Sequence, residues 1–141
     1  MAKNSFQNRS EKSSLSRAFH FLSFRSRSEK EMRDFLSKNE LEAEDTIIRL
    51  KELDLINDAK FTKEFVNRTK GKKLLSIELK RKGIPEEVIS DQLSVINEIE
   101  LAEKFLNKKK NIKDDEQVKR LLYARGFSWD TIEKVIKKRY N

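Results

Sequence analysis

The stretch SEKEMRDFLSKNEL, residues 28–41, is the first copy of the pattern from which the fold is predicted, because its apolar positions recur twice along the chain. Met32 and Leu36 lie four residues apart, on one face of a helix. Together with positions 41 and 50 they begin four apolar columns, each with an interval of 43 residues: Met32, Leu75 and Val118; Leu36, Leu79 and Leu122; Leu41, Ile84 and Phe127; and Leu50, Leu93 and Ile136. Four columns in one register predict a tandem repeat of helix pairs.

A further helix is predicted before each pair. Its apolar residues again lie four apart: Ala18 and Leu22, Phe61 and Phe65, and Leu101 and Phe105. The second and third of these helices are separated by 40 residues instead of 43, so a longer loop is expected at 107–113. We therefore expect helices over residues 14–25, 28–38, 43–54, 58–69, 72–82, 85–96, 98–109, 115–124 and 129–140. An alternative is one irregular helical domain in which the regular spacing is a coincidence.

Boundary signals agree with these helices. Ser28 and Glu31 form the pattern of a capping box, in which each side chain accepts a hydrogen bond from the other residue's backbone N–H. Asp58 and Ser128 are expected to be N-caps. Pro85 fits the first turn of a helix, where its missing N–H costs nothing.

The helix ends are marked by glycine in two of the three units. Gly83 and Gly126 stand where a helix is expected to end in a left-handed residue, and Glu40 takes that place in the first unit. Between the sixth and seventh helices we expect a bend at Asn97, although a continuous helix is an alternative because neither Gly nor Pro separates them.

The predicted architecture is all-α, with three tandem three-helix repeats that form an elongated, curved array. A flexible N-terminal tail is expected over residues 1–13, and the repeats over residues 14–56, 57–96 and 97–141. No segment alternates like a β-strand between turns.

The composition favours binding over catalysis. There are 32 Lys and Arg against 24 Asp and Glu, a formal net charge of +8, which favours polyanions or acidic protein surfaces as partners. The absence of Cys excludes disulfides and thiolate metal sites. His20, the single histidine, has no ligand at a suitable spacing, and Gly71 begins no complete phosphate-binding loop. We expect no enzyme, no cofactor and no metal, and, without a signal peptide or membrane span, a cytoplasmic protein.

Several segments resemble the RecX family. Residues 18–32 resemble its opening, a short helix followed by Arg-x-Arg-Ser-Glu-x-Glu, and residues 55–66 resemble its middle motif. Residues 80–84 and 122–127 are similar to its two later turns. In this order the segments make the chain similar to RecX proteins over about residues 15–140. It departs from the family at Ser26, where Pro is common, and at Glu40, where a Gly-like residue is usual.

This resemblance implies a function. A RecX-like protein would regulate homologous recombination and DNA repair, as part of the SOS response, by binding RecA on single-stranded DNA. It would lie in the groove of the RecA filament and inhibit filament extension, ATPase activity and strand exchange, or promote disassembly. We expect it to act as a monomer. The alternative is a non-specific, basic nucleic-acid-binding helical protein that acts independently of RecA.

The candidate partner or nucleic-acid contacts are basic residues at helix ends and loops. Arg25 and Arg27 come first, although a local pair with Glu29 or Glu31 is an alternative for them. For the others the alternative is a solvated helix face or an interaction with a helix dipole. The full set is Arg25, Arg27, Lys30, Lys70, Lys72, Lys73, Lys80, Arg81, Lys82, Lys108, Lys109 and Lys110.

Aromatic residues are a second set of candidates. Phe19, Phe21 and Phe24 cannot all face one core, so one or two of them are expected to be exposed for docking or base stacking, or else covered by the next unit. Trp129 is expected to pack over Gly126 and Phe127.

Overall fold

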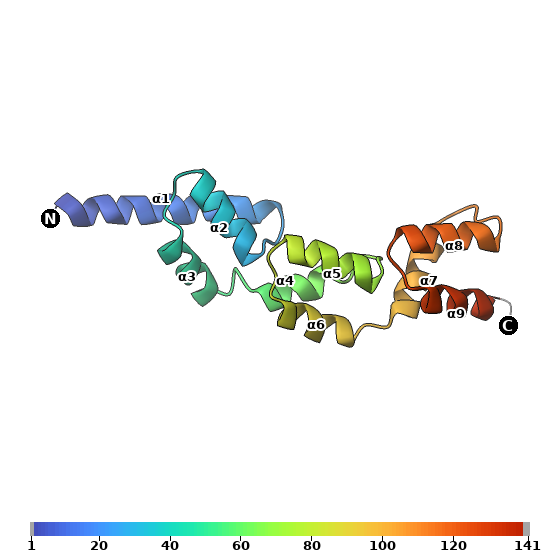
Figure 1. Cartoon of the computed structure of the whole chain (residues 1–141). Helices are drawn as coiled ribbons and strands as arrows, with labels where there is room; N and C mark the ends of the chain where they lie inside the picture. The colour runs from blue at the N-terminus through green and yellow to red at the C-terminus, as the bar shows by residue number, and fades with distance from the viewer. Residues whose placement is uncertain (1, 140–141) are drawn as a thin grey trace. The chain divides into compact units, whose positions relative to one another are not determined.

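The computed structural model describes residues 2–139, which form nine α-helices and no strand. Figure 1 labels the helices along the chain: α1 Ala2–Phe24, α2 Glu29–Lys38, α3 Glu44–Glu52, α4 Asp58–Phe65, α5 Lys72–Arg81, α6 Glu86–Ser94, α7 Glu98–Lys108, α8 Asp115–Ala124 and α9 Trp129–Arg139. The predicted all-α class is therefore confirmed. The start of α1 and the end of α4 differ clearly from expectation. Every other helix boundary lies within two residues of the one expected.

Helix α1 begins at Ala2, well before the expected start at residue 14. Residues 2–13 contain neither Gly nor Pro, so no strong helix breaker stands in this stretch. The predicted tail, residues 1–13, is thus helical from Ala2 onward, and Met1 lies outside the described residues.

Helix α4 ends at Phe65, four residues before its expected end. The segment that follows is used for a contact distant in sequence: the Arg125 guanidinium donates to the Thr69 carbonyl at 3.2 Å. The Gly71 N–H donates to the Arg125 carbonyl at 2.8 Å. Periodicity along one helix contains no information about such a contact, and the prediction failed there for that reason.

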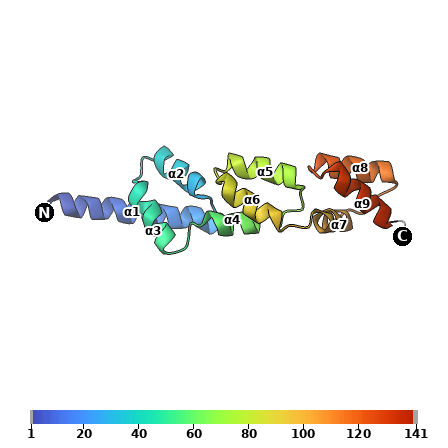
Figure 2. The same ribbon diagram turned by 60° about the horizontal axis from the view of Figure 1, so that its bottom comes forward.

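The chain divides into two compact units. One comprises residues up to Phe61 together with Lys82–Ile84, and the other comprises Thr62–Arg81 and the residues from Pro85 onward. In the first unit α1, α2 and α3 pack against one another (Figure 1). Their core contains Ala18, Met32, Leu36, Ile47, Leu50 and Ile56. In the second unit α5 packs on α6, and α9 packs on both α7 and α8 (Figure 2).

Burial follows the predicted columns. Met32, Leu75 and Val118 are fully buried, and so are Leu36, Leu79 and Leu122. In the third column Ile84 and Phe127 are buried and Leu41 is half-buried, and in the fourth Leu50 is buried whereas Leu93 and Ile136 are half-buried. Phe61, Phe65, Leu101 and Phe105 are also buried. The 43-residue pattern therefore marks the core, while the exact repeat boundaries remain a prediction.

The three helix ends at this interval share one backbone conformation. Gly83 and Gly126 have φ angles of +79° and +85°, as the sequence predicts. Glu40 has a φ of +57°, so the same turn forms in the first unit without glycine. A side chain in this left-handed region costs about 1–2 kcal/mol, and the packing around the turn must compensate for that cost.

The helix starts agree with expectation in most cases. The capping box of Ser28 and Glu31 is present, and the Ser128 Oγ accepts from the Thr131 N–H at 3.2 Å. The prediction for Asp58 was wrong: Asn57 is the cap of α4, since its Oδ1 accepts from the Lys60 N–H at 3.1 Å.

The predicted bend between the sixth and seventh helices is confirmed. Helix α6 ends at Ser94, and Asn97 is the N-cap of α7, accepting from the Ile99 and Glu100 N–H groups. Pro85 is the N-cap of α6, one residue before the first turn in which the sequence predicted it.

Candidate functional site: an aromatic groove and its supporting junction

Two sets of contacts in the structure are related by the 43-residue interval. In the first, the Ser28 Oγ donates to the Lys82 carbonyl at 2.7 Å. In the second, the Gly71 N–H donates to the Arg125 carbonyl at 2.8 Å. Ser28 is the residue before α2, and Gly71 is the residue before α5. Lys82 is the residue after α5, and Arg125 is the residue after α8. We call these contacts the first junction and the second junction.

Each junction also contains a carboxylate that caps the neighbouring helix. The Asp58 Oδ1 accepts from the Glu29 N–H at 2.9 Å in the first junction. The Glu98 Oε2 accepts from the Lys72 N–H at 2.8 Å in the second. Both acids stand in the first turn of a helix, and each accepts a hydrogen bond from an N–H that would otherwise lack a partner at the start of another helix. Helix starts are thereby linked to one another in both junctions.

Glu98 is the more extensively bonded of the two acids. Its Oε1 accepts from the Ser128 N–H and Oγ, both at 3.1 Å, and from the Thr131 Oγ1 at 2.6 Å. Burial raises the pKa of Glu98, but these donors together with the Lys72 N–H outweigh burial and hold the pKa below its ordinary value. The ionised carboxylate thus joins the starts of α5, α7 and α9.

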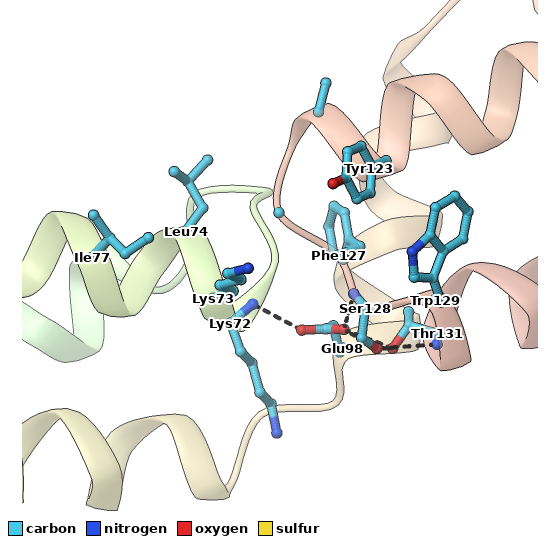
Figure 3. A pocket seen from close by; sticks show the side chains of 12 residues that line it. Lys72, Lys73, Leu74, Ile77, Glu98, Tyr123, Phe127, Ser128, Trp129 and Thr131 are labelled. Carbon is cyan, nitrogen blue, oxygen red and sulfur yellow. Dashed lines mark hydrogen bonds between the residues drawn. The ribbon is translucent and has the colours of Figure 1, made fainter.

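Beside Glu98 lies a groove of about 840 Å³ between α5 and the turn that joins α8 to α9 (Figure 3). We call it the aromatic groove and define it by its apolar lining: Leu74, Ile77, Tyr123, Phe127 and Trp129. Lys72 and Lys73 lie on its α5 side. The groove belongs entirely to the second unit, so its geometry depends only on contacts within that unit.

Two exposed aromatic rings stand on the α8–α9 side. Tyr123 and Trp129 are stacked, with ring centroids 5.2 Å apart and an angle of 23° between the rings. They are 61% and 56% exposed. The sequence placed Trp129 over Gly126 and Phe127; these residues line the same groove, but the ring partner of Trp129 is Tyr123.

Several basic candidates from the sequence are held by nearby carboxylates. The Arg25 guanidinium lies 2.5 Å from Glu31, and the Lys82 ammonium lies 3.5 Å from the same carboxylate. Lys70 pairs with Glu78 at 2.7 Å, Lys80 with Glu86 at 3.2 Å, and Lys30 is 4.0 Å from Asp34. The local pair considered for Arg25 is therefore present, and these five residues have structural partners.

Glu31 shows how strongly the first junction gathers charge. Burial raises its pKa, but the hydrogen bonds from Arg25 and the Ser28 N–H, with the positive charge of Lys82, lower the pKa to about 2. The Glu31 carboxylate is thus a fixed centre for two of the basic candidates.

Arg27 lies against the first helix. Its guanidinium stands 3.7 Å from the centre of the Phe21 ring and donates to the Phe21 carbonyl at 3.4 Å. Burial, followed by the neighbouring charge of Arg25, lowers the pKa of Arg27. This arrangement indicates a packing role for Arg27.

The remaining candidates have no ion pair within residues 2–139. Lys109 lies 5.4 Å from the Phe105 ring, and its neighbours in the loop after α7 are exposed. The cations concerned are Lys72, Lys73, Arg81, Lys108, Lys109 and Lys110. The structure thus separates the twelve sequence candidates into six with local partners and six without an ion pair among the described residues, of which Lys109 lies over the Phe105 ring.

The three phenylalanines of α1 behave as expected. Phe21 stacks on Phe35 with a centroid distance of 4.1 Å, whereas Phe19 and Phe24 are exposed, Phe24 by 69%. Sequence reasoning missed Tyr123 and Glu98. A signal for Glu98 was present: Ile-Asn precedes it, as it precedes Asp58, 40 residues earlier.

Within the part of the chain that the structure describes, no group of three or more His, Cys, Asp or Glu side chains could hold a metal ion. Nor is any described helix long and apolar enough to span a membrane.

Comparison with known proteins gives a consistent family. Residues 15–50 match the family model "RecX, first three-helix domain". The chain is 32% identical to "Regulatory protein RecX" of Bacillus pumilus (strain SAFR-032), covering 92% of this chain and 56% of that protein. It is 34% identical to the Oceanobacillus iheyensis protein of the same name, covering 84% and 50%. The chain thus spans about half the length of these curated relatives.

A solved structure agrees along nearly the whole chain. The crystal structure of RecX from Lactobacillus salivarius superposes with a TM-score of 0.72 at 26% identity, covering 93% of this chain and 97% of that one. Taken together with the two sequence relatives and the matched first domain, this similarity shows that the chain belongs to the RecX family.

Proposed function

We propose that the chain regulates homologous recombination and DNA repair by binding RecA filaments. Bound in the filament groove, it inhibits filament extension, ATPase activity and strand exchange. The observation that carries this proposal is the similarity to RecX proteins over more than nine-tenths of the chain. Proteins with that name are regulatory, and the resemblance of the motifs implies RecA as the target.

The surface supports binding to an acidic polymer. Lys72, Lys73 and Arg81 lie on α5, and Lys108, Lys109 and Lys110 lie at the end of α7 and in the following loop; none has an ion pair among the described residues. An unpaired surface cation can pair with a partner's anion without first breaking an internal ion pair. The net charge of +8 also accelerates encounter with a negatively charged filament.

The test is a titration of the protein into a RecA-dependent ATPase assay on single-stranded DNA. We expect inhibition at concentrations well below those needed to coat the DNA, because the protein acts on the filament and not on free sites. The control is the same titration with DNA length increased at constant RecA concentration, which should leave the inhibitory concentration unchanged.

A second candidate function is non-specific nucleic-acid binding without RecA. It is favoured by the three consecutive exposed lysines, Lys108–Lys110. Under this alternative, inhibition requires saturation of the DNA, and affinity for DNA alone falls steeply with salt as counterions are released. Inhibition that tracks DNA coverage in the ATPase titration would decide for this alternative.

A further inference from the structure

We propose that the aromatic groove captures a short segment of the partner protein, in which an apolar anchor residue stands beside a carboxylate. This deepens the proposed function and rests on it, because the partner is taken to be the RecA filament. The structural basis is one groove with an exposed, stacked Tyr–Trp pair on one side and, on the other, two lysines that have no ion pair within residues 2–139.

The exposed rings are the first argument. Tyr123 and Trp129 leave more than half of their surface open to water, and the exposed Ile77 faces the same groove from α5. Single exposed apolar residues are ordinary, but several gathered in one hollow mark a binding surface. Tyr and Trp are also the residues that most often dominate the affinity of protein–protein interfaces.

The charges around the groove define the second part of the ligand. Lys72 and Lys73 lie on the α5 side and have no ion pair within the described residues. Both carboxylate oxygens of Glu98 already accept hydrogen bonds from backbone N–H and hydroxyl groups. Glu98 therefore competes less for the ammonium groups of Lys72 and Lys73 than an acid without donors would. A ligand carboxylate can therefore pair with Lys72 or Lys73 while its apolar neighbour lies against the rings.

Glu98 also helps to choose between a protein segment and a nucleic acid. Its carboxylate is ionised, since its pKa lies below the ordinary value, and it lines the groove beside Lys72. A chain of phosphates that crosses the groove would meet this negative charge, whereas a peptide with one carboxylate can place it at the lysine side. Leu74, Ile77 and Phe127 add apolar lining that a stacked base would not need.

The two walls are fixed before any ligand arrives. A Cβ atom on Gly71 would stand 2.1 Å from the Gly126 carbonyl oxygen, so the start of α5 touches the backbone of the α8–α9 turn. The hydrogen bond from Gly71 to Arg125 and the bridging Glu98 hold the same two segments. A preformed groove avoids part of the ordering cost of binding, which favours a short linear ligand.

The test measures the affinity of purified variants for RecA filaments assembled on single-stranded DNA with a non-hydrolysable ATP analogue. The double variant Tyr123→Ala/Trp129→Ala should weaken binding by about tenfold or more, as expected for interface hot spots. The matched control is Val95→Ala, which removes an apolar side chain that is 82% exposed in the same unit but outside the groove lining, and it should bind like the unmodified protein.

A charge variant tests the other half of the groove without removing a ring. Lys72→Glu/Lys73→Glu should lose about tenfold in affinity and show a weaker dependence on salt. Its control, Lys63→Glu/Lys104→Glu, carries the same change in net charge at two exposed positions of the second unit outside the groove. Thermal melting of all variants establishes that each remains folded.

The outcomes separate the two proposals. If the unmodified chain does not bind RecA filaments, the proposed function fails and this inference fails with it. If the unmodified chain binds and both groove variants bind equally well, the groove inference alone is overturned. Trp129 is the single tryptophan, so its fluorescence reports on the groove directly. Quenching by oligo-dT that is lost in Tyr123→Ala would assign the groove to a nucleobase and overturn the protein-segment proposal.

Discussion

The first and second junctions use the same positions of the 43-residue interval but different chemistry. Ser28 donates through its side chain to the Lys82 carbonyl, whereas Gly71 donates through its backbone to the Arg125 carbonyl. Arg25 and Lys82 surround the Glu31 carboxylate in the first junction, and the interval places the apolar Leu74 at the position of Glu31 in the second. The 43-residue interval therefore preserves where the contacts to the backbone form, while the side chains around them differ.

The consequence is that ion pairs hold the first junction, whereas close backbone contact and hydrogen bonds hold the second, in which the Arg125 guanidinium donates to the Thr69 carbonyl and not to a carboxylate. Glu98 accepts from two hydroxyls and two backbone N–H groups, so no cation is needed to hold it. The cations of the first junction have basic counterparts in the second, Arg68 and Arg125, but the carboxylate they surround does not, because Leu74 stands in place of Glu31. Lys72 and Lys73, beside the aromatic groove, have no ion pair among the described residues. The aromatic groove lies beside this second junction, within the second unit.

The variant expected to lose the most stability is one that disrupts the second junction. Gly71→Ala would place a Cβ atom 2.1 Å from the Gly126 carbonyl oxygen and 2.4 Å from the Phe127 nitrogen, and neither backbone atom can move freely. We expect a loss of roughly 3 kcal/mol in the free energy of unfolding, measured by denaturant titration. At Gly83 the added Cβ would stand 2.4 Å from the Lys30 Cδ, which can swing away, and 2.5 Å from the Lys30 Cβ, which cannot. The positive φ adds its own cost, so Gly83→Ala should lose about 1–3 kcal/mol, less than Gly71→Ala, which meets backbone atoms alone. Equal, small losses at both positions would contradict the comparison.

The two capping acids should respond oppositely to pH. The folded protein holds the pKa of Glu98 below its ordinary value of 4.5, so ionised Glu98 stabilises the fold above about pH 4.5, and this contribution is lost as pH falls through the lowered pKa. Burial, with the nearby charge of Glu29, raises the pKa of Asp58 above 3.8 despite the N–H it accepts. The folded state therefore binds the Asp58 proton more tightly, and the stability gained at low pH is lost as pH rises through the raised pKa.

Neutral isosteres test this difference. Glu98→Gln should lose about 1–2 kcal/mol at pH 7 because an amide N–H₂ replaces one oxygen among four donors, and the loss should shrink on acidification below pH 4.5. Asp58→Asn keeps an acceptor for the Glu29 N–H, so at pH 7 it should be neutral or stabilise by less than about 1 kcal/mol. Urea denaturation from pH 7 to pH 3 measures both; the same pH trend in the two variants would refute the assignment.

A smaller effect is expected from the cations of the first junction. Arg25→Ala/Arg27→Ala removes the ion pair with Glu31 and the contact of Arg27 with Phe21. Since the Arg25 pair is partly exposed, we expect a combined loss of about 1–2 kcal/mol in thermal or denaturant unfolding. Unchanged stability together with weaker inhibition of RecA would instead mark these arginines as partner contacts.

The smallest effect improves the turn that departs from the glycine pattern. Glu40 has the left-handed conformation that Gly83 and Gly126 adopt at the same position of the interval. Glu40→Gly should stabilise the chain by up to about 1 kcal/mol, because removal of the strain is partly offset by the greater flexibility of glycine in the unfolded chain. A higher melting temperature is the readout, and Asn39→Gly, beside it with φ of −94°, is the control that should not stabilise.

Some local features of the fold could be predicted from the sequence and others could not. The capping box at Ser28, the left-handed Gly83 and the bend at Asn97 each depend on hydrogen bonds within one turn, so their residue types predict them well. The prediction for Asp58 failed because its carboxylate caps a helix 29 residues earlier instead of its own. Which lysines would remain unpaired was equally inaccessible, since the partner of Lys82 lies 51 residues away.

The all-α class, nearly all helix boundaries and the buried columns could be predicted from the sequence, because a 3.6-residue period and local capping are properties of neighbouring residues. Three features became visible in the folded chain alone: Glu98 joins three helix starts, Gly71 touches Gly126, and Tyr123 and Trp129 line a groove beside two lysines. The hydrogen bonds that join α5 and the segment before it to α7 and to the turn after α8 connect residues 26 to 56 positions apart, although Tyr123 and Trp129 themselves are close in sequence. The geometry of these features follows from how side chains from separate helices pack together, which no single stretch of sequence specifies.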